Sequence, residues 1–161
     1  TGLGYRRIGL MLDQDENSRV NYSWLGGYLA AQAMSEGTKL EPLVTFSTDS
    51  GRRVSAWLRR TRPDAVIGFG PKPFLTLRAL GYSIPGDMAY AALDVEQFHL
   101  DQVEDVTGIN QNLPLIGATA IDILASQLYH NEQGLPQRPV FSMIEGFWVD
   151  GQTAPSRRPA G

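Results

Sequence analysis

Short apolar runs recur along the first ninety-odd residues of the chain. They cover Arg7 to Leu12, Leu43 to Phe46, Ala65 to Phe69 and Met88 to Leu93, and polar or glycine-containing turns bound them. Runs of this length, rich in aliphatic and aromatic side chains, are typical of buried strands. The pattern therefore predicts four strands.

Helical patterns lie between and after these strands. From about Arg19 to Ser35, apolar positions recur every three or four residues, which predicts a helix with one buried stripe. A second helix follows the cap candidates Ser47 to Ser50 and ends before Pro63, a short one covers Pro73 to Leu80, and a long one begins at Pro114. The predicted buried stripes are Val20, Trp24, Tyr28, Ala31 and Met34; then Val54, Trp57 and Leu58; and finally Ile116, Ala120, Ile123, Leu124 and Leu128.

The end of the chain has less periodicity. A long loop runs from Asp94 to Asp105, Val140 to Met143 and Phe147 to Val149 are predicted closing strands, and Ala154 to Gly161 form a Pro- and Arg-containing tail. Strands that alternate with helices predict an α/β fold, with a parallel sheet flanked by helices on both faces.

Ligands of such sheets bind beyond the carboxyl ends of the strands. That edge carries a carboxylate, a guanidinium, two amides and aromatic rings, which belong to Asp94, Arg19, Asn17, Asn21, Phe46, Phe69 and Trp24. Carboxylates grip hydroxyl groups and rings stack on sugars or bases, so these residues are candidates for a small-molecule site. Each also has a purely structural interpretation: Asp94 as a turn cap, the rings as core, and Arg19 as a solvated helix start.

Composition narrows the function classes. The chain has 161 residues, a net charge of −3, no cysteine and two histidines. A nucleic-acid-binding domain is normally basic, so the chain by itself should not bind duplex DNA, and a Cys- or His-based metal site is not expected. No hydrolase elbow, zinc-protease motif or phosphate-binding loop is present, so no enzyme is indicated and no cofactor is expected. The acids near Asp13, even with Lys72 nearby, fit a solvated loop.

No apolar run is long enough to span a membrane and no signal-peptide pattern opens the chain, which predicts a cytoplasmic protein.

Several segments, in order, resemble the effector-binding core of LacI/GalR-type transcriptional regulators. They are Gly4 to Leu10, Gly27-Tyr28, Leu77 to Met88, Asp94, Val106 to Asn112, and Phe147 to Thr153. The stretch from Pro85 to Asp94 is the most specific part.

This resemblance implies a periplasmic-binding-protein-like type I lobe. Residues 1–153 would be the C-terminal lobe with its crossover segments, and 154–161 a flexible tail. The first lobe and the N-terminal DNA-binding domain would be absent from the chain. It also implies a small-molecule effector, Gln111 as a further ligand-binding residue, contact with operator DNA only through the absent domain, and a homodimer. Candidates for the dimer contact are Pro73 to Leu80 and the loop Val95 to Asp105, with Phe98 and Leu100.

Three positions depart from the family pattern. Trp24 stands where the family places a ligand-binding Arg, and Phe69-Gly70 replace its Asn-Asp pair. A larger glycoside, an aromatic ligand or no ligand are therefore open alternatives to a monosaccharide. A solute-binding protein of the same fold that serves a transporter is the alternative function.

Overall fold

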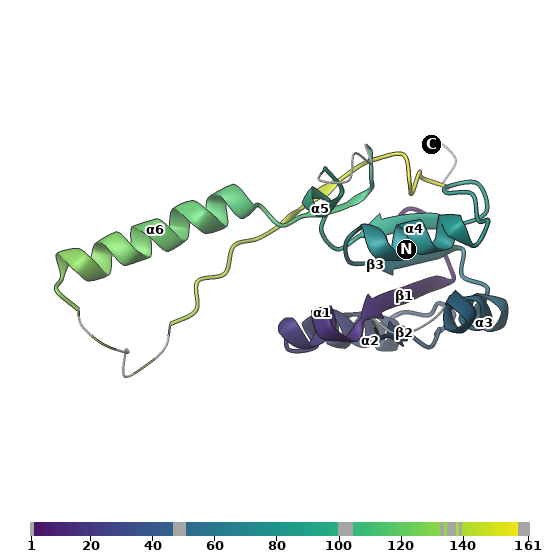
Figure 1. Ribbon diagram of the computed structural model, residues 1–161, viewed down its shortest axis with the longest axis horizontal. Helices are drawn as coiled ribbons and strands as arrows, with labels where there is room; N and C mark the ends of the chain where they lie inside the picture. Colours follow the sequence, from purple (N-terminus) through teal and green to yellow (C-terminus); the bar gives the residue numbers. More distant parts are fainter. Residues whose placement is uncertain are drawn as a thin grey trace.

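The structure, a computed structural model, describes residues 2–46, 51–99, 105–132, 134, 138 and 140–157. Six strands form one sheet in the order β2-β1-β3-β4-β5-β6 (Figure 1). The first five strands are parallel and β6 is antiparallel to β5. The strands are β1 (Ile8–Asp13), β2 (Leu43–Thr45), β3 (Ala65–Gly68), β4 (Ala89–Ala92), β5 (Gly108–Asn110) and β6 (Phe147–Val149).

The predicted α/β class and parallel sheet are confirmed, and the four predicted strands correspond to β1–β4. Strand β5 was not predicted, because three residues without alternation carry no strand pattern. The helices are α1 (Gln14–Arg19), α2 (Ser23–Met34), α3 (Gly51–Thr61), α4 (Pro71–Ala79), α5 (Glu96–His99) and α6 (Leu113–Tyr129).

The larger core lies on one face of the sheet, under α3, α4 and α5. Aromatic side chains fill it: Phe74 meets Tyr90 and Phe98 edge-on, with ring centroids 5.4 and 5.8 Å apart. Trp57 is buried beside them and donates from Nε1 to the Glu41 carbonyl at 2.7 Å. Phe98 is only 1% exposed, so its predicted role in a dimer contact is wrong, and Leu100 lies outside the described residues.

The opposite face is covered above β1 by α2. Tyr28 packs on Leu10 and Leu12 and donates from its hydroxyl to the Ile8 carbonyl at 2.8 Å. The helix predicted from about Arg19 to Ser35 is broken near its start. It begins at Ser23 as α2, because Asn21 and Tyr22 have φ values of +50° and +60°, and the segment before it, predicted as a polar loop, forms α1.

The break in this helix re-aims its residues. Of the stripe predicted to be buried, only Tyr28 on α2 is buried. Trp24 is half-buried, and Ala31 and Met34 are exposed.

Strands β4 and β5 are joined by two buried threonines. The Thr107 hydroxyl accepts from the backbone N–H groups of Gly151 and Ala154 at 3.1 Å each, and the Thr153 hydroxyl donates to the Tyr90 carbonyl at 2.8 Å. Gly108 lies so close to β4 that a Cβ would come within 2.2 Å of the Ala92 carbonyl oxygen. The closing segment is therefore fastened to the middle of the sheet.

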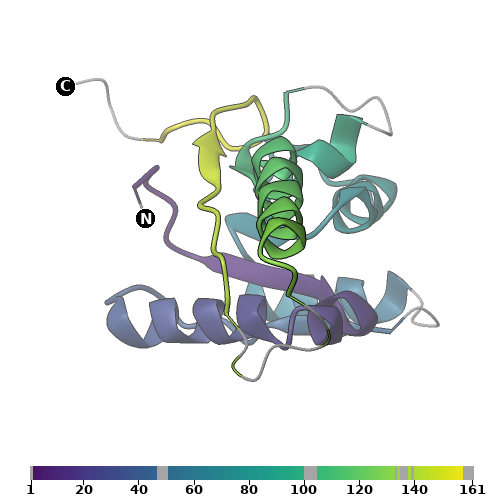
Figure 2. The same ribbon diagram turned by 90° about the vertical axis from the view of Figure 1, so that its left-hand side faces the viewer.

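Helix α6 projects away from the sheet in Figure 1, and Figure 2 views the molecule from that side. The stripe predicted to be buried is wrong, because α6 has no buried residue and Ile116, Ile123, Leu124 and Leu128 are exposed. Within the described part of the chain, no other element buries this helix. None of the described helices is long and apolar enough to cross a membrane.

Two expectations for the C-terminal part change. Val140 to Met143 do not form a strand, and their apolar side chains are exposed. The start of the predicted flexible tail is packed: Ala154 is buried, and the Tyr5 hydroxyl donates to the Pro155 carbonyl at 2.7 Å. The Arg157 guanidinium lies 4.6 Å from the Tyr5 ring centroid.

Replacing Thr107 by Val should destabilise the fold. The exchange keeps the shape but leaves the N–H groups of Gly151 and Ala154 without an acceptor, at a cost of about 2–4 kcal/mol for two unsatisfied donors. We expect the Tm in thermal unfolding to fall by roughly 5–10 °C at this chain length. Thr107→Ser, which keeps the hydroxyl, should melt near the parent; equal losses in the two variants would contradict the assignment.

Candidate functional site

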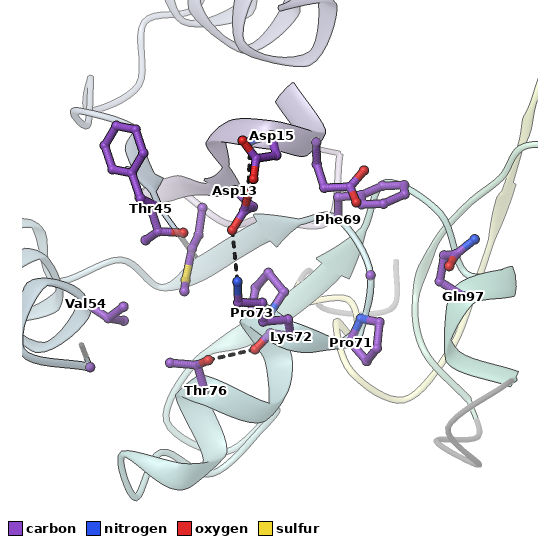
Figure 3. Close-up of a pocket in the computed structure, with 15 residues that line it drawn as sticks. Asp13, Asp15, Thr45, Val54, Phe69, Pro71, Lys72, Pro73, Thr76 and Gln97 are labelled. Carbon is purple, nitrogen blue, oxygen red and sulfur yellow. Dashed lines mark hydrogen bonds and ion pairs between the residues drawn. The ribbon is translucent and has the colours of Figure 1, made fainter. Parts of the chain in front are cut away.

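A pocket of about 470 Å³ opens at the carboxyl ends of β1, β2 and β3 (Figure 3). Strand β1 leads into α2 on one face of the sheet, whereas β3 leads into α4 on the other. The pocket therefore lies where the connections diverge, which is the usual ligand position in open parallel sheets. Its lining residues are Met11, Asp13, Asp15, Glu16, Thr45, Phe46, Gly51, Val54, Phe69, Gly70, Pro71, Lys72, Pro73, Thr76 and Gln97.

An ion pair crosses the pocket between β1 and α4. Lys72 Nζ donates to the Asp13 carboxylate at 2.9 Å, and the other carboxylate oxygen accepts from the backbone N–H of Asp15 at 3.0 Å (Figure 3). Partial burial opposes ionisation of Asp13, but the hydrogen bonds from Lys72 and from the backbone of α1 outweigh it and lower the pKa. The prediction of a solvated acidic loop missed the ion pair of Asp13 with Lys72, because the sequence does not show that α4 turns Lys72 toward β1.

Trp24 and Phe69, which stand where the resemblance implies polar ligand-binding groups, meet in space. Trp24 from α2 and Phe69 from the end of β3 stack with ring centroids 4.6 Å apart and an interplanar angle of 24°. The Arg19 guanidinium lies 5.7 Å from the Phe69 centroid and pairs with Glu16 at 2.8 Å. Phe69 lines the pocket, whereas Trp24 and Arg19 pack against Phe69 and are not themselves lining residues.

Phe46 follows β2 and contributes a second aromatic group to the pocket. Its side chain is 51% exposed, and the Arg53 guanidinium lies 5.9 Å from its ring centroid. The predicted site residues Phe46, Phe69, Arg19 and Trp24 therefore all lie in or directly behind this pocket.

Asp94 and Gln111 lie at the ends of β4 and β5. Asp94 is only 2% exposed and accepts from the Glu96 backbone N–H at 3.0 Å and from Gln97 Nε2 at 3.4 Å. Gln111 Nε2 donates to the Leu93 carbonyl at 3.1 Å. Asp94 thus caps α5 and holds Gln97, which lines the pocket. Neither Asp94 nor Gln111 is itself a lining residue.

Asn17 is one of the amides that the sequence places after the first strand. It lies on α1 with no exposed surface, and neither its Nδ2 nor its Oδ1 has a hydrogen-bond partner. The sequence marks its position near the edge, whereas its burial follows from the packing of α1. Within the described residues, no group of three or more His, Asp or Glu side chains could hold a metal ion.

Residues 1–153 match the family model described as a periplasmic binding protein-like domain. The chain belongs to this family. No curated protein sequence is significantly similar to this periplasmic-binding-protein-like chain.

Several solved structures that share this fold are transcriptional regulators. One from Silicibacter pomeroyi is 23% identical with a TM-score of 0.60, over 95% of this chain and 48% of that one. The Escherichia coli transcriptional repressor ascG is 15% identical with a TM-score of 0.72, over 95% and 57%. An Enterococcus faecium regulator with bound ribose is 16% identical with a TM-score of 0.62, over 97% and 59%. The chain spans about half the length of these structures.

The Asp13–Lys72 pair predicts a pH-dependent contribution to stability. Because the folded pKa of Asp13 is lowered, the contribution is present above the unfolded value near 3.8 and is lost as the pH falls through the folded pKa. Lys72→Met should cost up to about 1 kcal/mol at pH 7, since Lys72 is well exposed, and the difference should vanish at acid pH. Denaturant unfolding at pH 7 and pH 2.5 measures this. Lys39→Met, at an exposed lysine without an ion pair, is the control, and an equal loss there would refute the pair.

Proposed function

We propose that the chain is the ligand-sensing lobe of a LacI-type transcriptional regulator. The pocket at the carboxyl edge of the sheet, in a chain that belongs to the binding-protein-like family, carries this proposal. The similar structures are regulators rather than enzymes, and they do not favour a transporter-serving solute-binding protein. The regulator acts in the cytoplasm, and a helix-turn-helix domain outside this chain contacts the operator.

The lobe is one half of a two-lobed core. In support, the chain spans about half of each similar structure, and α6 presents an apolar surface to solvent. A helix with exposed leucines and isoleucines on most sides is stable when another layer covers it. The other lobe supplies that layer, and residues 1–153 form the C-terminal lobe with its crossover segments.

Ligand binding between the lobes then controls DNA binding. A small molecule held at the carboxyl edge is contacted by Phe46, Phe69, Trp24 and Arg19 on this side, with Asp94 and Gln111 at the ends of the neighbouring strands. A ligand that binds the closed cleft better than the open one shifts the population toward closure. The DNA-binding heads change their relative orientation with it, which makes the coupling allosteric.

The proposed regulator is a homodimer that uses the outer face of α4. Leu75 on this helix is exposed, whereas Phe74 and Leu77 are buried in the core beneath it. An apolar side chain on an outer helix face is suited to a symmetric contact, because the same patch meets itself across a two-fold axis.

Leu75→Glu should weaken this dimer. A carboxylate facing its own copy across the axis is both desolvated and repelled, so we expect a shift to monomer at micromolar concentration. Light scattering over a concentration series measures the mass. Leu29→Glu, on α2 and about as exposed, is the control and should remain dimeric. If the parent is monomeric at every concentration, the α4 contact is ruled out.

Binding at the edge can be tested with the ¹⁵N-labelled chain and a panel of ribose, glucose, methyl β-D-glucoside and p-nitrophenyl β-D-glucoside. We expect at least one compound to shift the backbone amides at the ends of β1 and β3, near Asp13 and Phe69, and to leave the opposite edge, near Ile8 and Ala89, unchanged. A panel in which no compound shifts the amides of this edge would reject the function.

Asp94→Asn separates ligand binding from helix capping. The amide keeps an oxygen that can accept from the Glu96 N–H, so the Tm should change little. One compound of the panel is expected to shift the amides at this edge. Loss of a charge-assisted hydrogen bond should weaken the binding of that compound about tenfold. Asp87→Asn, at an exposed turn carboxylate, is the matched control. Unchanged affinity in Asp94→Asn would restrict Asp94 to capping α5.

A further inference from the structure

The polar side chains that line the edge pocket are almost all paired within the lobe. Asp13 is held by Lys72, Glu16 by Arg19, and Gln97 by Asp94. The two lining threonines donate to backbone carbonyls, Thr45 to that of Leu12 and Thr76 to that of Lys72. Among the described lining residues, the Asp15 carboxylate is the one charged group without a side-chain hydrogen bond or ion pair.

A monosaccharide is recognised by several directional hydrogen bonds to its hydroxyl groups. In this pocket such bonds would have to displace existing ones, and each displaced partner would be left unsatisfied at a cost in binding free energy. What the pocket offers without displacement is ring surface. Phe46 is half-exposed and lines the pocket. Phe69 also lines the pocket, and Trp24 stacks on its ring.

The stack also fixes the orientation of Phe69. Trp24 packs parallel to its ring and the Arg19 guanidinium lies over it, while Glu16 holds that guanidinium in place. A ring locked in this way loses little entropy when a ligand ring contacts it, so preorganisation favours a rigid planar partner.

The charged groups of the pocket restrict the class of ligand further. Of its three lining carboxylates, Asp13 pairs with Lys72 and Glu16 pairs with Arg19. The Asp15 carboxylate keeps its negative charge, so it repels an anionic group placed beside it and can accept a hydrogen bond from a hydroxyl or an amine.

We propose that the Trp24–Phe69 stack is the specificity-determining feature of this site, and that it selects a neutral or cationic aryl compound with hydrogen-bond donors over a simple monosaccharide. The inference rests on the proposed function and names the ligand class of the same pocket. An aryl glycoside is one such compound, because its aryl ring contacts Phe69 while a hydroxyl reaches Asp15.

Three probes can test this with the full ¹⁵N-labelled chain. They are p-nitrophenyl β-D-glucoside, methyl β-D-glucoside without the ring, and p-nitrophenyl phosphate with the ring and a negative charge. We expect the first to shift the amides of Phe69 and Gly70 and to bind at least roughly fivefold more tightly than the other two, as an aromatic contact implies.

Phe69→Leu tests the stack itself. Leucine keeps an apolar side chain beside Leu10 and Leu12 but abolishes the stack and the cation–π contact. Nitrophenyl glucoside binding should fall roughly two- to tenfold, while methyl glucoside binding does not change. Phe147→Leu, at a phenylalanine on β6 that does not line the pocket, should bind like the parent. If Phe69→Leu does not fold, Trp24→Leu and nuclear Overhauser contacts between the nitrophenyl and Phe69 rings replace it.

The outcomes distinguish the inferred preference for an aryl ligand from the proposed sensing function. If methyl glucoside shifts the same amides and binds as tightly as the aryl glucoside, the aryl inference is overturned and the sensing function stands. Tight binding of p-nitrophenyl phosphate also overturns the aryl inference and leaves the sensing function standing. The same holds if Phe69→Leu does not change the affinity for the aryl glucoside. If none of the three probes shifts the pocket amides, the inference falls, and the full panel decides the function.

Discussion

The parallel register of β1 to β5 is the constraint on which the rest of this lobe depends. Parallel strands place all their carboxyl ends at one edge, so side chains distant in sequence, such as Asp13, Phe46 and Phe69, converge there. The register holds because small residues allow close approach: Gly108 leaves no room for a Cβ against β4. The buried threonines Thr107 and Thr153 then tie the end of the chain across β4 and β5.

The same constraint explains why part of the sheet leaves apolar surface exposed. A parallel sheet is normally covered on both faces. Helices α3, α4 and α5 bury one face, but α2 covers the other mainly above β1, where Tyr28 packs. Over β3 and β4 that face lines an apolar groove with Ile67 and Ala91, and α6 extends away from it (Figure 1). An exposed apolar helix and an apolar groove in one chain both agree with a lobe that is completed by a second one.

At the carboxyl edge, Trp24 and Phe69 support one another. Both stand where the resemblance to LacI/GalR-type regulators implies polar ligand-binding groups. Their rings stack with centroids 4.6 Å apart, and the Arg19 guanidinium lies over the Phe69 ring. The three side chains therefore form one packed unit, of which Phe69 faces the pocket.

Patterns along the chain were enough to predict the fold class, the four central strands and the edge at which to look for a ligand. These follow from local periodicity and from the order of the elements, both of which are properties of the chain. The family resemblance, confirmed over residues 1–153, likewise came from motifs in order.

Only the tertiary structure decided which groups meet. That Lys72 pairs with Asp13, that Trp24 stacks on Phe69, and that Asn17 is buried without a partner depend on how α1, α2 and α4 are placed over β1 and β3. The apolar stripe of α6 shows the same limit. Periodicity identifies a face that must be buried, but what buries it is a property of the neighbours in space, and within the described chain none covers it.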